Sequence, residues 1–433
     1  MSKNKKLKIL IVSWWFYPEI GAGTNRVLDL IKYLPQEKFE LYVLCRKNEK
    51  STYKSELFLK HENSSFPIAR IYRAPTFMTY AWLNVPAMLI FFIISFLIIL
   101  IKKIDIVFMT VPEIENVLAS FFSAKILRKP CIVDVRDRWE AARIDFIESN
   151  YFPFSSRSMK SLFKIYTILL KNVFKLVYRS CVALTVVTLS IAKYFKHNRM
   201  GKRIYVVPNA ADITIFKPMA EKARKQLRSK LGISEDALVI VFEGTLAPEY
   251  RMDLVLAALR DLKFNKVSNF VLLIVGKIPD WSREKAKIDY LVEKFCLKEN
   301  VKFLGSVPSR KTVAKIIAIS DLGIIPLEIK DVWKYRVPLK FYEYLSCGIP
   351  VIAFCSKDSE LYRLITKYNC GIAITNHKNI AENLANILMK ISAKKDEIKE
   401  KMGRNGLLLV RKVFNRAITA KMFEKIFLSV KNS

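Results

Sequence analysis

The sequence predicts an α/β protein of two domains, each built on a parallel sheet that helices cover on both faces. Its 433 residues exceed what one core usually organises, and 52% of them are hydrophobic, which is enough for two cores. The opening segment fits a strand at 7–13, a loop, an amphipathic helix at about 25–34 and a second strand at 39–45. That order is typical of a doubly wound, Rossmann-like sheet. A further helix–strand unit is predicted at 337–354.

The segment 337–354 reads V-P-L-K-F-Y-E-Y-L-S-C-G-I-P-V-I-A-F. Pro338 fits the first position of a helix, where its missing N–H costs nothing, and Gly348 followed by Pro350 fits the end of that helix. The apolar run 351–354 is typical of a parallel strand covered on both faces.

Two charged residues of this short helix indicate nucleotide chemistry. Lys340 and Glu343 are three residues apart, so they share one helix face. The free N–H groups of a helix N-terminus suit a phosphate, and a carboxylate just behind them can accept two hydrogen bonds from a diol such as ribose. An ordinary buried helix and strand with both charged side chains in solvent explains the same spacing.

The same segment resembles the nucleotide-sugar signature of glycosyltransferase family 4, a retaining family with the GT-B fold. That signature runs Pro-x-Lys-x-x-Glu, then a hydrophobic and a small residue, then Gly-x-Pro-Val. The resemblance implies two Rossmann-like domains that face each other across a cleft, with a C-terminal helix that returns to the first domain. It also implies that Glu343 holds the donor ribose. The family usually carries a second Glu eight positions earlier, where this chain has Tyr335.

The resemblance continues at the first strand of the second domain. The strand at 238–242 is followed by E-G-T-L-A-P-E-Y-R. In the family, a Gly-Arg pair and a basic residue about six positions later neutralise the donor diphosphate. Here Thr245 stands in the arginine position and Arg251 in the second basic position. We expect Arg251, Lys340 and helix N-termini to meet the charge that develops on the diphosphate.

The resemblance assigns donor binding to Gly23, Gly244, Thr245, Tyr335, Leu339 and Glu343. It assigns catalysis to Asp137, Arg251 and Lys340. The strand and loop at 301–307 resemble those that flank the nucleotide base, and the strand at 321–326 precedes the signature helix. No cofactor and no metal are expected, since the family uses protein cations and no Asp-x-Asp motif stands at a strand end.

Two segments of the first domain fit the other side of the cleft. P-E-I-G-A-G at 18–23 resembles the family's Pro-x-x-Gly-Gly loop at the cleft floor, although two glycines fit a plain loop equally well. D-V-R-D-R-W at 134–139 ends a strand in charges, as at the ligand edge of an open α/β sheet. This motif resembles one in a bacterial polysaccharide-assembly branch of the family, with Arg136 where other branches have His. Asp137 is the acceptor-side candidate, and a structural cluster of ion pairs is the alternative.

Residues 74–101 carry no charge, and 87–101 is the most hydrophobic part. A single membrane crossing would separate the strands before it from the next strand at 105–110, which must pair in the same sheet. We therefore expect a helix that lies in or dips into one leaflet, with Phe91 and Ile94 facing lipid, and 80–86 as its extension. A buried core helix is the alternative.

The segment 159–179 predicts a second membrane contact. Its five basic residues fall within one stripe of about 100° on a helix, and Leu, Phe, Ile and Val lie opposite. The basic residues are Lys160, Lys164, Lys171, Lys175 and Arg179. Such a helix is typical of membrane surfaces, and a helix with an unusually basic solvated face is the alternative.

The overall charge points the same way. With 73 Lys and Arg against 39 Asp and Glu, the net charge of +34 implies a polyanionic partner: a membrane surface, a nucleic acid or a phosphorylated substrate. The charge clusters beside apolar segments, which favours lipid over nucleic acid. Seven cysteines without a C-x-x-C pair indicate a reduced, cytosolic setting, and M-S-K-N-K-K leads into a strand without a signal peptide. The three histidines show no metal-binding spacing.

We expect three parts: a first domain at 1–215 with the membrane segments, a nucleotide-sugar domain at 216–410, and a returning helix at 411–433. P-N-A-A-D at 208–212 resembles the family's hinge, 216–232 fits an interdomain linker, and 407–430 has the periodicity of one helix.

The predicted function is transfer of a sugar, with retention, from a UDP- or GDP-sugar to a membrane-associated, lipid-linked or saccharide acceptor in glycan or polysaccharide assembly. The protein should lie at the cytoplasmic face of the membrane, peripheral or monotopic. A nucleotide-sugar-binding partner without its own catalysis is the alternative that Tyr335 and Thr245 favour.

Overall fold

The computed structural model describes residues 6–17, 19, 21–47, 69–75, 85–112, 114–149, 157–267, 269–279, 282–307 and 309–431. The chain forms two compact units. Unit 1 comprises Met1–Ile147, Phe154–Pro208 and Arg416–Ser433, and unit 2 comprises Glu148–Pro153 and Asn209–Asn415.

Unit 1 contains a seven-stranded parallel sheet in the order β3-β2-β1-β4-β5-β6-β7. Its strands are β1 (Leu7–Val12), β2 (Phe39–Arg46), β3 (Ala69–Ala74), β4 (Ile106–Val111), β5 (Cys131–Val135), β6 (Ala183–Val186) and β7 (Ile204–Val206). Its helices are α1 (Ala22–Tyr33), α3 (Val85–Ile101), α4 (Ile114–Ile126), α5 (Trp139–Glu148), α6 (Arg157–Ser180), α7 (Leu189–His197) and α17 (Arg416–Lys431). The Rossmann-like beginning predicted from the sequence is confirmed.

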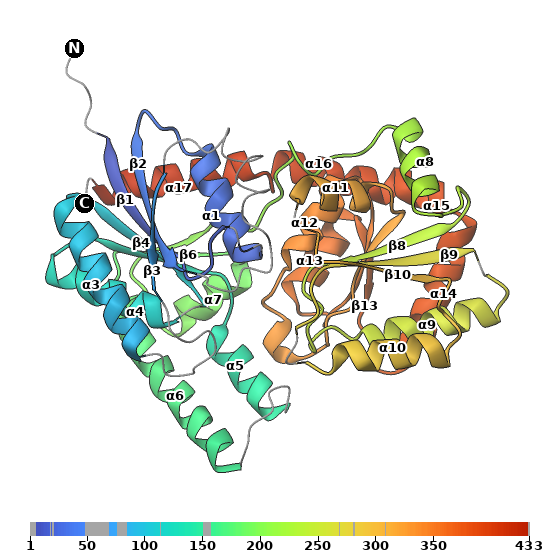
Figure 1. Cartoon of the computed structure of the whole chain (residues 1–433), viewed down its shortest axis with the longest axis horizontal. Coiled ribbons are helices and arrows are strands. Elements are labelled where there is room, and N and C mark those ends of the chain that lie inside the picture. Colours follow the sequence, from blue (N-terminus) through green and yellow to red (C-terminus); the bar gives the residue numbers. More distant parts are fainter. Residues whose placement is uncertain are drawn as a thin grey trace. The chain divides into compact units, whose positions relative to one another are not determined.

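Strand order fixes which face of this sheet each helix covers. The connections β3 to β4, β4 to β5 and β5 to β6 all run in one direction across the sheet, and β1 to β2 runs in the opposite direction. Parallel crossovers are right-handed in nearly all proteins, so α3, α4 and α6 share one face and α1 covers the other (Figure 1).

The C-terminal segment is two helices and not the single helix predicted for 407–430. The first, α16 (Arg404–Lys412), belongs to unit 2, and α17 belongs to unit 1. Helix α17 packs on α1 and completes the core of unit 1. Phe427 lies 5.4 Å from Phe108 and 6.1 Å from Phe39, measured between ring centroids.

Unit 2 contains a six-stranded parallel sheet in the order β10-β9-β8-β11-β12-β13. Its strands are β8 (Leu238–Glu243), β9 (Phe270–Val275), β10 (Val301–Gly305), β11 (Leu322–Ile325), β12 (Val351–Phe354) and β13 (Gly371–Ile374). Its helices are α8 (Glu221–Lys230), α9 (Met252–Phe264), α10 (Glu284–Lys294), α11 (Arg310–Ala318), η1 (Asp331–Trp333), α12 (Leu339–Ser346), α13 (Glu360–Tyr368), α14 (Ile380–Ala393), α15 (Lys395–Ile398), η2 (Lys399–Gly403) and α16.

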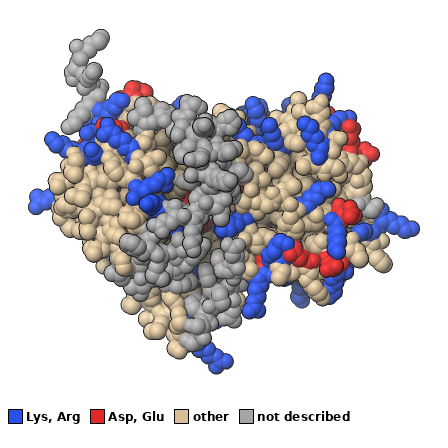
Figure 2. All heavy atoms as spheres, in the orientation of Figure 1, with Lys and Arg blue, Asp and Glu red and all other residues tan. Residues whose placement is uncertain are grey.

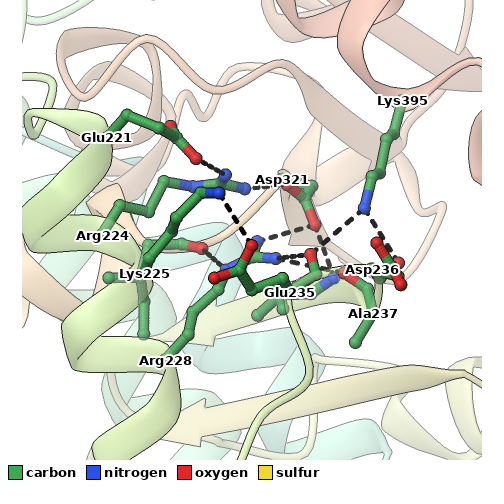
Figure 3. A network of polar contacts seen from close by, with 11 residues as sticks. Glu221, Arg224, Lys225, Arg228, Glu235, Asp236, Ala237, Asp321 and Lys395 are labelled. Carbon is green, nitrogen blue, oxygen red and sulfur yellow. Dashed lines mark hydrogen bonds and ion pairs between the residues drawn. The ribbon is translucent and has the colours of Figure 1, made fainter.

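The segment 216–232, predicted as an interdomain linker, is instead part of unit 2. Helix α8 points two arginines at the buried carboxylate of Asp321, which precedes β11 (Figure 3). The Arg228 Nη2 lies 2.9 Å from Asp321 Oδ2, and that oxygen also accepts the backbone N–H of Val239 at 2.8 Å. The linker prediction failed because α8 looks mostly charged and polar in sequence, whereas its Arg228 is almost completely buried.

The uncharged segment predicted to meet a membrane forms α3, while its proposed extension 80–86 lies outside the described residues except for 85 and 86. Phe91, taken as lipid-facing, is fully buried and stacks on Trp14 with ring centroids 5.4 Å apart. The opposite side of α3 is exposed, so neither an entirely buried nor an entirely lipid-facing helix describes it. Within the described part of the chain, no helix combines the length and the hydrophobicity needed to span a bilayer.

Candidate active site

Helix α12 carries the central residues of the candidate donor site. Pro338 is its N-cap and not its first residue, one position from the expectation. Gly348 adopts φ +75°, the left-handed conformation predicted for the end of the helix, and β12 is buried throughout. Lys340 is 5% exposed and Glu343 is 3% exposed. The alternative that both side chains are solvated is therefore wrong.

The ammonium group of Lys340 lies between two aromatic rings. Its Nζ is 3.8 Å from the centroid of Phe242 and 4.1 Å from that of Tyr250, which is cation–π geometry. Among the described residues it has no hydrogen-bond partner. Burial lowers the pKa of Lys340 to about 7, and the nearby Glu243 carboxylate opposes this shift. A buried, unbonded ammonium at a helix start can receive an anionic ligand.

The end of β8 brings Glu243 and Gly244 to Lys340. Gly244 has φ +108°, and a Cβ at this position would lie 3.4 Å from the Nζ of Lys340. Thr245 follows and is exposed, whereas the rest of the loop up to Tyr250 is buried. Burial raises the pKa of Glu243, against the opposing charges of Lys340 and Arg310. The structure thus brings Gly244 next to Lys340 and adds Glu243, which was not predicted from the sequence, while Thr245 lies exposed one residue beyond Gly244.

Arg251, assigned to the donor diphosphate, is the N-cap of α9, one residue after Tyr250. Its guanidinium forms two hydrogen bonds to the Asp253 carboxylate, each 3.0 Å long. Lys287 lies 3.5 Å from the same carboxylate. The pKa of Asp253 is lowered, since the hydrogen bond and charge of Arg251 outweigh burial. Arg251 therefore stands at the expected edge of the sheet, but part of its hydrogen-bonding capacity is engaged.

Two other residues predicted to bind the sugar donor lie at or just before the start of α12. Leu339 is its first residue and is buried. Tyr335 is partly exposed, and the Nζ of Lys334 lies 5.4 Å from its ring centroid. The adjacent Arg336 contacts the buried Glu249 at 3.4 Å. Arg336 and Glu249 were not identified from the sequence.

In unit 1, Gly23 and the charged motif after β5 come together. A Cβ on Gly23 would lie only 2.0 Å from Nη1 of Arg136, so the guanidinium occupies the space that a larger residue would need. Arg136 also donates from Nε to the carbonyl of Val111, at the end of β4. Asp137 follows directly and is partly exposed. The missing side chain at Gly23 leaves room for this close approach of the Arg136 guanidinium.

The first acidic residue of the same motif has a structural role. Asp134 is fully buried and forms a two-pronged ion pair with Arg26 of α1, at 2.8 and 2.9 Å. It also accepts from Thr185 Oγ1 at 2.6 Å. The ion-pair alternative for D-V-R-D-R-W is therefore confirmed at Asp134, and the acceptor-side role of Asp137 stays a prediction.

The start of α1 completes this edge of the unit 1 sheet. The helix has no side-chain cap and no acidic residue in its first turn. The Thr24 hydroxyl is buried and has no partner among the residues described. Free N–H groups next to the Arg136 guanidinium suit an anionic group. In the described ranges, no group of three or more His, Cys, Asp or Glu side chains is arranged to hold a metal ion.

Two family models match the chain, one on each part. The model "Glycosyltransferase Family 4" matches residues 23–215, and "Glycosyl transferases group 1" matches residues 223–408. The chain belongs to the family 4 glycosyltransferases. The two matches together include all the candidate site residues of this glycosyltransferase.

Curated relatives of the glycosyltransferase include two proteins named D-inositol 3-phosphate glycosyltransferase. The one from Segniliparus rotundus is 27% identical over 152 residues, which are 35% of this chain and 32% of the relative. The one from Corynebacterium efficiens is 24% identical over 228 residues, 52% of this chain and 50% of the relative. The chain thus matches only about a third to a half of the length of these relatives.

Solved structures show that the glycosyltransferase has the GT-B fold. Sucrose-phosphate synthase from Thermosynechococcus elongatus is 15% identical with a TM-score of 0.71, covering 98% of this chain and 99% of the other. The Anabaena protein HepE, solved in complex with UDP-glucose, is 15% identical with a TM-score of 0.67, covering 98% and 100%. A glycosyltransferase from Rickettsia africae is also 15% identical, with a TM-score of 0.72, covering 99% and 100%.

Proposed function

We propose that this glycosyltransferase moves a sugar from a UDP- or GDP-sugar to a membrane-associated acceptor, with retention at the anomeric carbon, in glycan or polysaccharide assembly. The observation that carries the proposal is the burial of Lys340 and Glu343 on α12 beside the glycine turn after β8. The complex of HepE with UDP-glucose supports a nucleotide-sugar donor. Family membership supports retention.

The chemistry assigned to unit 2 is leaving-group stabilisation. The Lys340 ammonium and the first N–H groups of α12 meet the negative charge that grows on the diphosphate as the glycosidic bond breaks. Glu343 accepts hydrogen bonds from the ribose hydroxyls, which fixes the position of the reacting carbon. Arg251 adds a second positive charge when its guanidinium turns from Asp253 to the diphosphate.

The acceptor is assigned to unit 1, near Gly23 and Asp137. The positive start of α1 and Arg136 favour an acceptor that carries a phosphate. The names of the curated relatives, which specify an inositol phosphate, agree with such a group. We assign a lipid-linked acceptor because of the apolar surface of unit 1, and we place the protein peripherally at the cytoplasmic face of the membrane.

A test of the donor assignment compares ribose and deoxyribose ligands. Wild type and Glu343→Ala are titrated calorimetrically with UDP, GDP and the 2′-deoxy form of whichever binds. Glu343→Ala should weaken binding of the ribose ligand by ~1.5–3 kcal/mol, the usual scale for a hydrogen bond to a charged group. It should also abolish the preference of the wild type for ribose. Glu382→Ala, at an exposed position on α14, is the matched control. If Glu343→Ala keeps both the affinity and the preference, Glu343 does not hold the ribose.

A nucleotide-sugar-binding subunit without catalysis is the second candidate. The engagement of Arg251 by Asp253, with Thr245 and Tyr335 in place of charged residues, favours it. Slow hydrolysis of the donor by the purified protein, measured as release of the nucleoside diphosphate and absent in Lys340→Met, would exclude it. Tight donor binding with no turnover in the presence of a membrane extract would favour it.

A further inference from the structure

The exposed hydrophobic residues of this protein gather on three helices of unit 1. Among the described residues, 22 large hydrophobic side chains are exposed, and 14 of them lie on α3, α4 and α6. Those on α3 are Leu89, Ile93, Leu97, Leu100 and Ile101; those on α4 are Phe122 and Ile126; those on α6 are Met159, Leu162, Ile165, Ile168, Leu169, Val173 and Leu176. Such a concentration marks an interaction surface, because single exposed hydrophobic residues are otherwise scattered.

The three helices form one continuous face. Crossover handedness places them on the same side of the sheet, where Figure 1 shows them in the order α3, α4, α6. Helices α3 and α4 pack closely, with the Ser95 and Ser123 hydroxyls 2.8 Å apart in the seam. The Nζ of Lys125, at the end of α4, donates to the carbonyl of Ser180, at the end of α6, at 2.7 Å. We call these three helices, with their 14 exposed side chains, the apolar face.

Helix α6 has three sides, not the two that the sequence predicted. Its buried side contains Thr167, Leu170, Phe174, Val177 and Tyr178. Its exposed hydrophobic residues recur every three or four positions, at 162, 165, 169, 173 and 176, and form a separate stripe. At 100° per residue, the basic residues lie on the flank between the two. A hydrophobic stripe in solvent beside a row of cations is the pattern of a helix that lies in a membrane interface.

The charge of the apolar face indicates which kind of partner it can bind. Helices α3 and α6 contain no Asp or Glu, and α4 contains one, Glu115. Helix α6 alone has six basic residues, and Lys102, Lys103 and Arg128 follow α3 and α4. Figure 2 shows the surface over α3 and α4 as largely uncharged, with Lys and Arg at its margins. A second copy of this chain would bring two basic surfaces together, whereas an anionic bilayer offers both acyl chains and negative headgroups.

We propose that the apolar face docks on an anionic lipid bilayer, with its hydrophobic side chains among the acyl chains and its flanking cations among the headgroups. The proposal rests on the proposed function, since a membrane-associated acceptor gives this docking its purpose. The evidence for it is nevertheless confined to unit 1. Lipid binding and donor binding, assigned to unit 2, can therefore fail independently.

Vesicle co-sedimentation of the full chain tests the proposal. Vesicles of phosphatidylglycerol with phosphatidylcholine should bind the wild type at 0.1 M NaCl and retain it at 1 M NaCl. Pure phosphatidylcholine should bind more weakly. Leu169→Asn with Leu176→Asn should reduce binding to the anionic vesicles at least about tenfold at both salt concentrations. Lys164→Gln with Arg179→Gln should reduce it mainly at low salt, because the Debye length falls from about 10 Å to about 3 Å.

The control replaces a hydrophobic residue elsewhere that is more exposed than Leu169 and Leu176. Phe264 of α9 is 88% exposed and lies in unit 2, so Phe264→Asn should bind vesicles as the wild type does. Unchanged melting temperature and unchanged nucleotide affinity show that each variant is folded. The proposal is overturned if the wild type does not bind anionic vesicles. It is also overturned if the variant with Leu169→Asn and Leu176→Asn binds them as tightly as the wild type. A dimer that the leucine variant dissociates, without vesicle binding, would assign the face to a second copy instead.

Discussion

Raising the pH from 6 to 8 should weaken donor binding about tenfold, because Lys340 loses its proton in that range. Burial lowers its pKa to about 7, so the ammonium form dominates below that pH and the neutral amine above it. A bound diphosphate favours the ammonium form. Besides Glu243, the charged groups that act on Lys340 are Arg336, Glu249 and Glu343.

The magnitude follows from the pKa. With a pKa of about 7, about 90% of the free protein carries a charged Lys340 at pH 6 and about 10% at pH 8. If only the charged form binds the diphosphate, the affinity changes by about the ratio of these fractions, tenfold or ~1.4 kcal/mol. Binding should also take up about half a proton at pH 7 and nearly one at pH 8.

The assay is isothermal titration calorimetry in buffers with different ionisation enthalpies, which measures affinity and proton uptake together. The intact nucleotide sugar is the ligand, since the terminal phosphate of a free diphosphate titrates near pH 6 and would obscure the signal. Lys340→Met should bind more weakly and lose the pH dependence. Glu243→Gln should move the transition to lower pH, because it removes the carboxylate that raises the pKa of Lys340. Constant affinity between pH 6 and 8 without proton uptake would refute this role of Lys340.

Two further substitutions test structural features directly. Asp321→Asn should lower the free energy of unfolding by about 3–5 kcal/mol in urea titrations, because it leaves the buried Arg228 without its counter-charge. Glu235→Gln, in an exposed ion pair of the same network, is the control and should leave the urea midpoint nearly unchanged. Equal destabilisation by the two substitutions would contradict the reasoning. Gly23→Ala should displace the Arg136 guanidinium and lower turnover about ten- to a hundredfold, while melting temperature and donor affinity stay the same. Gly21→Ala is the control, because no atom lies within 4 Å of its new Cβ. Full activity of Gly23→Ala would show that the position of Arg136 is unimportant for turnover.

Local patterns made much of the fold predictable, including the helix that carries Lys340 and Glu343. Helix α12 has its stop signal and its buried strand within 18 residues, so its position could be read from the sequence to within one residue. The family models confirm the resemblance on which the donor-site assignment depends. The roles of the individual residues stay predictions.

Features that depend on distant residues were not predictable. The two rings around Lys340 come from Phe242 and Tyr250, about 90 to 100 residues earlier, and sequence spacing gives no sign of their approach. The Asp253 carboxylate, which binds the Arg251 guanidinium, is only two residues away in sequence. Their pairing nevertheless depends on the loop geometry at the start of α9. Glu243 had a visible signal, an acidic residue at the end of an apolar strand, and it was overlooked.

Helix α6 shows the limit of periodicity most clearly. A helical wheel separates basic from apolar residues, yet it cannot tell which apolar residues meet the core. Leu170 and Phe174 are buried, while Leu169 and Val173, one position earlier, are exposed. Only the tertiary packing distinguishes these two stripes.

The return of α17 to unit 1 has a consequence for how the protein is made. Phe423 and Phe427 belong to the same core as β1 and β4, yet more than 200 residues of unit 2 are translated between them. During synthesis, the hydrophobic core of unit 1 therefore stays incomplete until residues 416–431 have left the ribosome. All residues of unit 2 have been translated before that point. Proteins usually fold domain by domain from the N-terminus. Here the last segment closes the first unit, so chains released before residue 416 expose the hydrophobic core of unit 1 and become substrates for chaperones and proteases.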